Sequence, residues 1–547
     1  MMRRSSIKIV GLAILLALNF ASAMREEDKG PASKVEILPS FWERLARERI
    51  QRSNTYYREP TKPAKNVILF LGDGMGIPTV SAGRFFKAEV EGRMGAANPL
   101  MDFEDWPFHT LCRTYDLHTE VTDSASSATA YLGGSLILKN GHVRRDGKVN
   151  QQTVVGNDDN RLRECEPQLH YPFNKCDICI SGTKTTTGVI GLTGDVRPKE
   201  CREYKEEEKI DSVLKAAIRA GKATGLVTTS RITHASPAVE KCIVDMAKDC
   251  KSEKDSPKDI ARQLLEENPE INVIIGGGSA MFYPKEAKGL RSDGRYIAEE
   301  WLQLMQSLGR NAKLVNNSKE FMKANVTSAD YLVGLLSPSH MPYEADRDPD
   351  EASIVNMTTA AVEILSRQPN VFEEAIREAL KMVDLEETLV ILTADHSHSF
   401  HLVGEPRRLS SLLDLDEGYG PIAFDGKGMT PLIYSSGPAG KVNTTRDDLN
   451  SPSIKAKLHD KEFRQPALVP LYSSTHAGED VGVYATGVFS QLFHSTVDNT
   501  FIAQSMKYAM CLTPFETEAH CINASATLGF SALSIILSLL VTRYNLC

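Results

Sequence analysis

Two short apolar runs, each ending at acidic and histidine side chains, constrain the fold of this chain more than any other feature. Residues 67–71 precede Asp73, and residues 389–393 precede Asp395 and His396. Aliphatic runs without polar alternation are typical of strands buried on both faces, as in a parallel sheet covered by helices. Because ligands bind at the carboxyl ends of such strands, these segments, about 300 residues apart, are predicted to meet at one site.

Other segments alternate between strand and helix patterns. Strand-like runs are residues 225–229 and 272–275, and helical patterns cover residues 212–220 and 260–267. This alternation predicts an α/β fold class, with a central, mostly parallel sheet and helices on both faces.

The domain organisation follows from changes in composition along the chain. Residues 24–62 are charged and predict an N-terminal helical arm, with its helix at residues 41–52, and the main domain is expected at residues 63–521. Residues 140–200 are irregular and contain an imperfect echo, between segments 153–156 and 188–191, that is either a local duplication or a coincidence.

Overall composition indicates a globular protein. The chain has 547 residues, of which 41% are hydrophobic and 24% charged, and its net charge is -8 without a long basic run. A nucleic-acid partner is therefore not expected.

Both ends of the chain carry export signals. Basic residues, the apolar stretch 9–20 and a small-residue site predict a signal peptide at residues 1–23. The apolar stretch 528–541 predicts a GPI-attachment signal at residues 522–547, with a tail-anchored or frayed end as the alternative. The expected location is the extracellular face of the plasma membrane, reached through the secretory pathway and held there by the lipid.

Export agrees with the cysteines and the glycosylation sequons. The ten cysteines are plausible disulfide partners, and Cys176 and Cys179 are interpreted as disulfide-bonded or free rather than zinc-binding. Asn523 is either a sequon or the lipid-attachment residue. The remaining sequons predict glycosylation at Asn316, Asn325, Asn356 and Asn443.

A serine-rich segment supplies a candidate nucleophile. Thr122 or Asp123 can cap a helix of small residues in which Ser124 occupies the first turn. The positive end of a helix favours a phosphate or an alkoxide, so Ser124 is a plausible nucleophile, although such a serine is more often only part of a cap. His234 with Ser236, and His476, follow or precede other strand-like runs.

Taken together and in this order, the segments 72–76, 123–125, 234–237, 393–398 and 475–480 resemble the animal alkaline phosphatases of the GPI-anchored type. The resemblance extends over about residues 66–521. It implies hydrolysis of small phosphate monoesters through a phosphoserine, with Zn²⁺ and Mg²⁺ as cofactors, and a homodimer. Sulfatases and phosphodiesterases are weaker matches, because their nucleophile is usually not a serine in an Asp-Ser-Ala setting.

The resemblance also implies a role for each matching residue. Ser124 would be the nucleophile, and His398 would lie just outside the metal ligands. It further implies disulfides between Cys201 and Cys250 and between Cys511 and Cys521. The implied metal site is made of Asp73, shared by magnesium and the second zinc; Asp395 and His396 on that zinc; Ser236 on magnesium with His234 nearby; and His476 on the first zinc.

Two segments of the family pattern have no counterpart. A Glu-Gly-Gly-Arg-Ile-Asp-His-Gly-His-His motif, which ends a strand and carries the magnesium glutamate and two ligands of the first zinc, is missing between residues 366 and 371. A phosphate-binding arginine is missing after residue 237. Activity is therefore expected to be impaired, and the strands beside the gap to lose ladder partners. The alternative function is that of a catalytically inactive, GPI-anchored surface protein that binds a ligand.

Overall fold

A computed structural model describes residues 39–56, 60–93, 100–133, 183–196, 202, 204–238, 258–366, 380–381, 383–407, 410–417 and 423–522. The predicted signal peptide, most of the segment 140–200 and the tail after residue 522 lie outside these ranges. Within the described ranges, every helix is too short or too polar to cross a bilayer.

The larger sheet contains both of the apolar runs that end at acidic side chains. Its order is β1-β7-β13-β2-β14, with bounds Asn66–Gly72, Thr388–Ala394, Val481–Gly487, Phe108–Arg113 and Val497–Asp498. Only β13 runs antiparallel to its neighbours among these described strands. The predicted α/β class with a mostly parallel sheet is confirmed.

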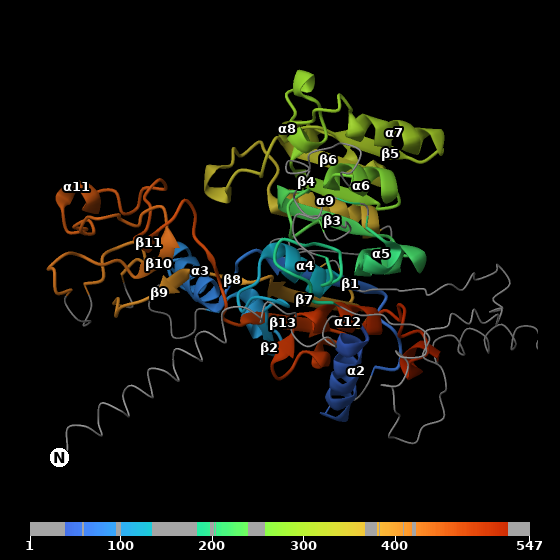
Figure 1. Ribbon diagram of the computed structural model, residues 1–547, viewed down its shortest axis with the longest axis horizontal. Helices are drawn as coiled ribbons and strands as arrows, with labels where there is room; N and C mark the ends of the chain where they lie inside the picture. Colours follow the sequence, from blue (N-terminus) through green and yellow to red (C-terminus); the bar gives the residue numbers. More distant parts are fainter. Residues whose placement is uncertain are drawn as a thin grey trace, which may run out of the picture.

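A second sheet is entirely parallel in its described strands. Its order is β3-β4-β6-β5, with bounds Gly225–Arg231, Val273–Gly277, Tyr331–Ser337 and Ala312–Val315. Figure 1 shows this sheet above the larger one. Val273 and Ile275 pack in one core with α9 (Ile354–Ser366), and Ile274 packs in another with α6 (Ile260–Glu267) and α7 (Ile297–Ser307). Successive strand residues thus point to opposite, helix-covered faces.

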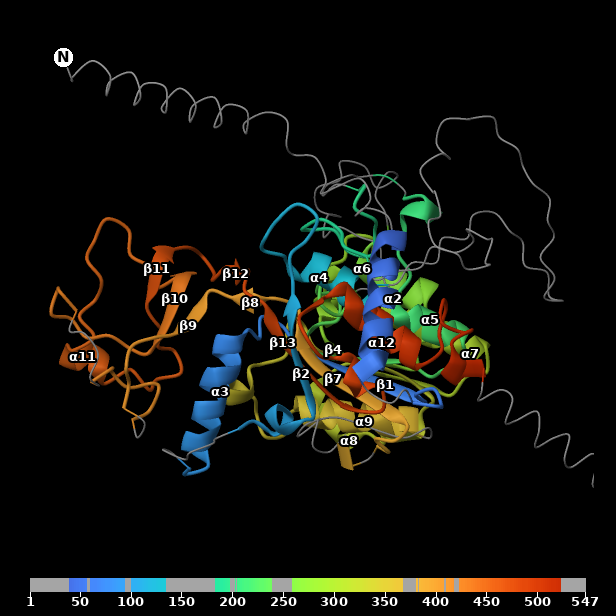
Figure 2. The same cartoon turned by 90° about the horizontal axis from the view of Figure 1, so that it is seen from below.

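Helices also cover the larger sheet. In Figure 2 the N-terminal helix α2 (Pro39–Tyr56) lies beside α12 (Thr500–Ala509), and Arg47 on α2 forms a 2.9 Å ion pair with Glu518. The predicted arm is therefore a helix packed on the domain. The other α-helices among the described residues are α3 (Ile77–Val90), α4 (Ser124–Leu132), α5 (Val213–Arg219), α8 (Ser318–Lys323) and α11 (Pro452–Lys455).

Two small sheets extend from the end of β7. One has the order β11-β10-β9 (Ala467–Pro470, Leu432–Gly437 and Phe400–Leu402), and α3 packs against β9, as Figure 1 shows. The other pairs β8 (Ser397–His398) with β12 (His476–Ala477) in antiparallel register.

The two main sheets meet without a common ladder in the described residues. There, β1 pairs only with β7, and β3 pairs only with β4. Lys222 Nζ, just before β3, donates a 3.0 Å hydrogen bond to the carbonyl of Lys65, just before β1. Every residue of β7 is buried, whereas only Phe70 is buried in β1. This is the pattern expected when β1 and β3 lack a neighbour on their facing sides.

Candidate metal centre

Strand register brings the two acidic strand ends together. β1 and β7 are parallel and paired along their whole length, with Gly72 opposite Ala394. Asp73 and Asp395 therefore leave adjacent strands at the same edge of the sheet. The sequence prediction that these distant strand ends come together is confirmed.

Asp73, Asp395 and His396 form a compact cluster of ligand atoms. One ligand atom from each lies within 4.8 Å of the other two. His396 Nε2 is 3.5 Å from Asp395 Oδ2 and 3.7 Å from Asp73 Oδ1. Asp395 and His396 are fully buried, whereas the Asp73 side chain is 45% exposed. Two acidic oxygens and an imidazole nitrogen at this spacing match the ligand types of a zinc site with an open fourth position.

Hydrogen bonds orient the ligand atoms of this cluster. Asp395 Oδ1 accepts the backbone N–H groups of Gly74 and His396, both at 3.0 Å. His396 Nδ1 lies 2.9 Å from the carbonyl oxygen of Ser397, which can only accept a hydrogen bond. The proton of neutral His396 therefore sits on Nδ1, and the lone pair of Nε2 faces the two carboxylates.

Ser124 lies beside this cluster at the start of α4. Asp123 caps the helix by accepting the N–H of Ser126 at 2.9 Å, which settles the choice between Thr122 and Asp123. Ser124 is 7% exposed, and its Oγ lies 3.0 Å from His396 Nε2. Ser127 Oγ donates a 2.7 Å bond to the carbonyl of Asp395, which holds the helix on the end of β7.

The second sheet contributes Ser236 and His234, which follow β3. Ser236 Oγ lies 3.1 Å from Asp73 Oδ2 and 3.2 Å from Asp395 Oδ2, so it reaches both carboxylates. His234 Nδ1 is buried without a hydrogen-bond partner, and its ring lies against that of His340, with centroids 5.4 Å apart. Oxygen ligands from Asp73 and Ser236 suit a magnesium ion that keeps several waters.

A group of three histidines adjoins the cluster. One ring nitrogen from each of His396, His398 and His476 lies within 4.8 Å of the other two. His398 and His476 face each other across the β8-β12 pair, and the rings of His396 and His476 are 3.9 Å apart. His398 therefore lies among possible ligand atoms. The family resemblance implies that His398 lies just outside the ligands, and this stays a prediction. Its pairing with His476 across two short strands could not be read from the sequence, because a two-residue strand leaves no pattern.

Burial sets the charge states of these groups. It raises the pKa of Asp395, and the charge of Asp73 adds to this effect, while the charge of His396 opposes it. Burial, reinforced by the charges of His396 and His398, lowers the pKa of His476 to about 4. Burial also lowers the pKa of His398. Neutral imidazoles keep their lone pairs available, so His398 and His476 suit a bound cation better than bound protons.

Two groups near the site were missed by sequence reasoning. Arg231, the last residue of β3, has a buried Nε without a hydrogen-bond partner. His340 has its pKa lowered first by burial and then by the charges of Arg231 and His234. The position of Arg231 at a strand end, three residues before His234, was the available signal. Residues 239–257, where the family arginine was sought, lie outside the described residues.

The remaining predicted residues are placed as follows. Cys511 and Cys521 form the expected disulfide, Cys112 is a buried free thiol, and Cys201 and Cys250 lie outside the described residues. Three sequon asparagines are exposed, namely Asn316, Asn325 and Asn443. Asn356 is half-buried, and its Oδ1 accepts the N–H of Ser353 at 3.0 Å.

Comparison with known proteins gives one consistent result. Residues 64–142, 177–372 and 370–512 match the alkaline phosphatase family. The alkaline phosphatase of Gadus morhua is 31% identical over 525 residues, which cover 87% of this chain and 97% of that protein. The tissue-nonspecific isozyme of alkaline phosphatase from Gallus gallus is 29% identical over 579 residues, covering 97% of this chain and 98% of that protein.

A solved structure agrees on the fold. The crystal structure of the Thermus thermophilus alkaline phosphatase has a TM-score of 0.50 at 19% sequence identity, covering 83% of this chain and 92% of that one. The second and third family matches meet at residues 370–372, where the sequence lacks the expected ligand motif. Alkaline phosphatases typically use zinc and magnesium, and the residues gathered here suit both ions. From the strand ends, the serine and these matches, the chain belongs to the alkaline phosphatase family and is a phosphate monoester hydrolase.

Proposed function

We propose that this chain forms a phosphoserine on Ser124, at a centre in which Asp73, Asp395 and His396 hold one zinc ion. The observation that supports this most directly is the 3.0 Å distance between Ser124 Oγ and His396 Nε2 at the positive end of α4. A bound zinc ion supplies positive charge that favours the serine alkoxide and offsets the charge that develops on the phosphoryl group.

The residues of the chain have distinct parts in this reaction. Ser124 Oγ forms a bond to phosphorus while the bond from phosphorus to the alcohol oxygen breaks, and the alcohol leaves with a proton. Water then attacks the phosphoserine, releasing inorganic phosphate and restoring the hydroxyl. The hydrogen bond from Ser127 to the Asp395 carbonyl fixes α4, and with it Ser124, beside the metal-binding cluster. The positive end of the α4 dipole favours the alkoxide of Ser124.

The first-zinc site and the magnesium site are proposed to bind their ions more weakly than the Asp73 cluster binds its zinc. His476, with His398 beside it, is the part of a first-zinc site that the described residues contain, and Asp73 and Ser236, with His234 nearby, are the part of a magnesium site. With fewer charged ligands than the Asp73 cluster, these sites are expected to hold their ions loosely. Hydrolysis of the phosphoserine is then expected to be slower than its formation.

The test is hydrolysis of p-nitrophenyl phosphate by the purified ectodomain at alkaline pH with zinc and magnesium, beside Ser124→Ala. The proposal predicts a burst of p-nitrophenol followed by slow turnover, with both lost at least about 1,000-fold in the variant. Metal content of the two proteins, measured by mass spectrometry, should be equal. Turnover that survives in Ser124→Ala would rule out this nucleophile.

A second candidate function is ligand binding without catalysis. It is favoured by the unpaired facing sides of β1 and β3 in the described residues, which are unusual in the middle of a catalytic sheet. The same experiment separates the two: a folded ectodomain with bound zinc and neither burst nor turnover would support the binding protein.

The cell-surface setting is also part of the proposal. The disulfide between Cys511 and Cys521 fits an oxidising compartment, and exposed sequon asparagines fit glycosylation. We expect a GPI-anchored homodimer at the extracellular face of the plasma membrane. Release of the protein from intact cells by a phosphatidylinositol-specific phospholipase C, with its size measured by light scattering, tests both features.

A further inference from the structure

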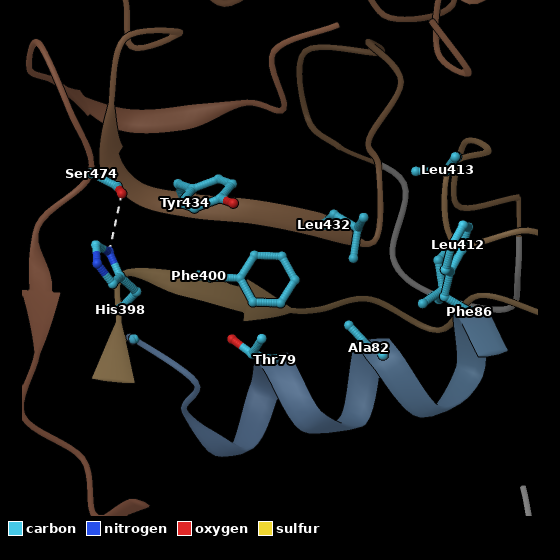
Figure 3. A pocket seen from close by; sticks show the side chains of 12 residues that line it. Thr79, Ala82, Phe86, His398, Phe400, Leu412, Leu413, Leu432, Tyr434 and Ser474 are labelled. Carbon is cyan, nitrogen blue, oxygen red and sulfur yellow. Dashed lines mark hydrogen bonds between the residues drawn. The ribbon is translucent and has the colours of Figure 1, made fainter. Parts of the chain in front are cut away.

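An apolar pocket opens beside the metal centre, between α3 and the β9-β10 pair. In Figure 3 the side chains of Thr79, Ala82 and Phe86 on α3 face Phe400 of β9 and Leu432 of β10. The volume of the pocket is about 540 Å³. This is within the usual range of small-molecule sites, about 300 to 1,000 Å³.

The two ends of the pocket differ in chemistry. Gly74, His398 and Ser474 line the end nearest the metal centre, and His398 Nδ1 lies 3.1 Å from Ser474 Oγ. Leu412 and Leu413 line the opposite end, seen in Figure 3. A molecule that fills the pocket therefore meets polar groups at one end and mostly carbon along the rest of its length.

The polar end is continuous with the candidate site. Gly74 follows Asp73 directly, and its N–H donates to Asp395 Oδ1 at 3.0 Å. The ring of His398 is 5.5 Å from that of His396, whose Nε2 contacts Ser124. If the phosphoryl group of an ester lies beside Ser124, the alcohol part of that ester is within reach of the polar end of this pocket.

Small residues on α3 keep the pocket open. Ala82 and Gly83 lie on the lining face, and a Cβ built on Gly83 would meet no atom within 4 Å. A glycine inside a helix is less favourable than an alanine, so this helix gives up stability at a position that leaves free volume.

We propose that this pocket binds the apolar part of the alcohol in a phosphate monoester, so that the chain prefers aromatic or bulky aliphatic esters. The proposal rests on the proposed function for turnover but not for binding. Polar alcohols would bury hydroxyl groups against Phe400 and Leu432 without hydrogen-bond partners, which is unfavourable because these groups lose their bonds to water. Apolar alcohols would instead remove carbon surface from water.

The test compares two esters of primary alcohols, 2-phenylethyl phosphate and ethyl phosphate, which have similar leaving groups. The full ectodomain should show a kcat/KM at least about tenfold higher for the phenylethyl ester. Ala82→Leu and Gly83→Leu fill the pocket and should each remove about tenfold of that preference while ethyl phosphate is unaffected. Gly83→Ala is the matched control and should keep the preference. Thermal melts verify that each variant is folded.

Binding of 2-naphthol, followed by its fluorescence, tests the pocket without any turnover. The ectodomain and Gly83→Ala should bind it, and the two leucine variants should bind it at least about tenfold more weakly. If neither ester is hydrolysed but naphthol binding behaves in this way, the proposed catalysis fails and the pocket stands. Unchanged preference and naphthol affinity in both leucine variants, or an equal loss for both esters, would overturn the proposal.

Discussion

Strands β1 and β7 resemble each other in sequence but differ in surroundings. Both are aliphatic runs followed by an aspartate of the candidate metal centre. β7 lies between β1 and β13 and is wholly buried, whereas β1 has one paired side in the described residues and buries only Phe70. Their aspartates differ in the same way, since Asp395 is fully buried and Asp73 is half-exposed. The difference teaches that an apolar run predicts a strand, but the neighbours of that strand decide how deeply each of its residues is buried.

The largest expected effects come from the two aspartates. Asp395→Asn and Asp73→Asn should each weaken zinc binding at least about 100-fold, because each removes a charged ligand. They should differ without metal: burial raises the pKa of Asp395, so its charge destabilises the metal-free fold and the amide relieves that cost.

Zinc titration against a chelator and melting of the metal-free proteins check this pair. Only Asp395→Asn should raise the metal-free melting temperature. Equal melting temperatures for the two metal-free variants would mean that Asp73 and Asp395 do not differ in burial as much as β1 and β7 do.

The next largest effect concerns packing within the strands. Ile391→Ala in β7 should lower the free energy of unfolding by about 2–5 kcal/mol, because it leaves a cavity in a fully buried core. Leu69→Ala in β1 should cost about half as much, since Leu69 is already partly exposed. Urea denaturation of both variants measures the difference, and a larger loss for Leu69→Ala would indicate that β1 is covered in solution.

The smallest expected effect concerns Lys507 and tests whether water reaches this buried side chain. Lys507 on α12 is 1% exposed, and burial lowers its pKa to about 8, well below the value in an unfolded chain. Between pH 8 and 10 the unfolded chain therefore binds more protons at this residue, so its charge destabilises the fold below pH 8 and the penalty fades as the pH rises.

Lys507→Met should be more stable than the unsubstituted protein at pH 7. Its advantage should shrink by about 2 kcal/mol between pH 8 and pH 10. Denaturation at several pH values measures this change. A difference that does not vary with pH would show that Lys507 keeps its charge by reaching water.

Much of the site was predictable because it depends on local sequence. The strand ends at Asp73 and Asp395 and the helix start at Ser124 follow from apolar periodicity and capping, and the structure places all three together. The contacts of His398 with His396 and His476 were not foreseen, and Arg231 was given no role. Both positions depend on contacts between segments far apart in the chain, for which a single sequence carries no signal.

By itself, the sequence determined the α/β class, the meeting of two distant strand ends at one edge, and the candidate nucleophile, because burial and helix capping act through side-chain patterns along the chain. Only the tertiary structure decided which histidines meet across β8 and β12, that Ser236 reaches both carboxylates, and that α3 leaves a pocket beside His398. Short strand pairs and spaces between elements arise from long-range packing, where many distant residues act together and none of them is marked in the sequence.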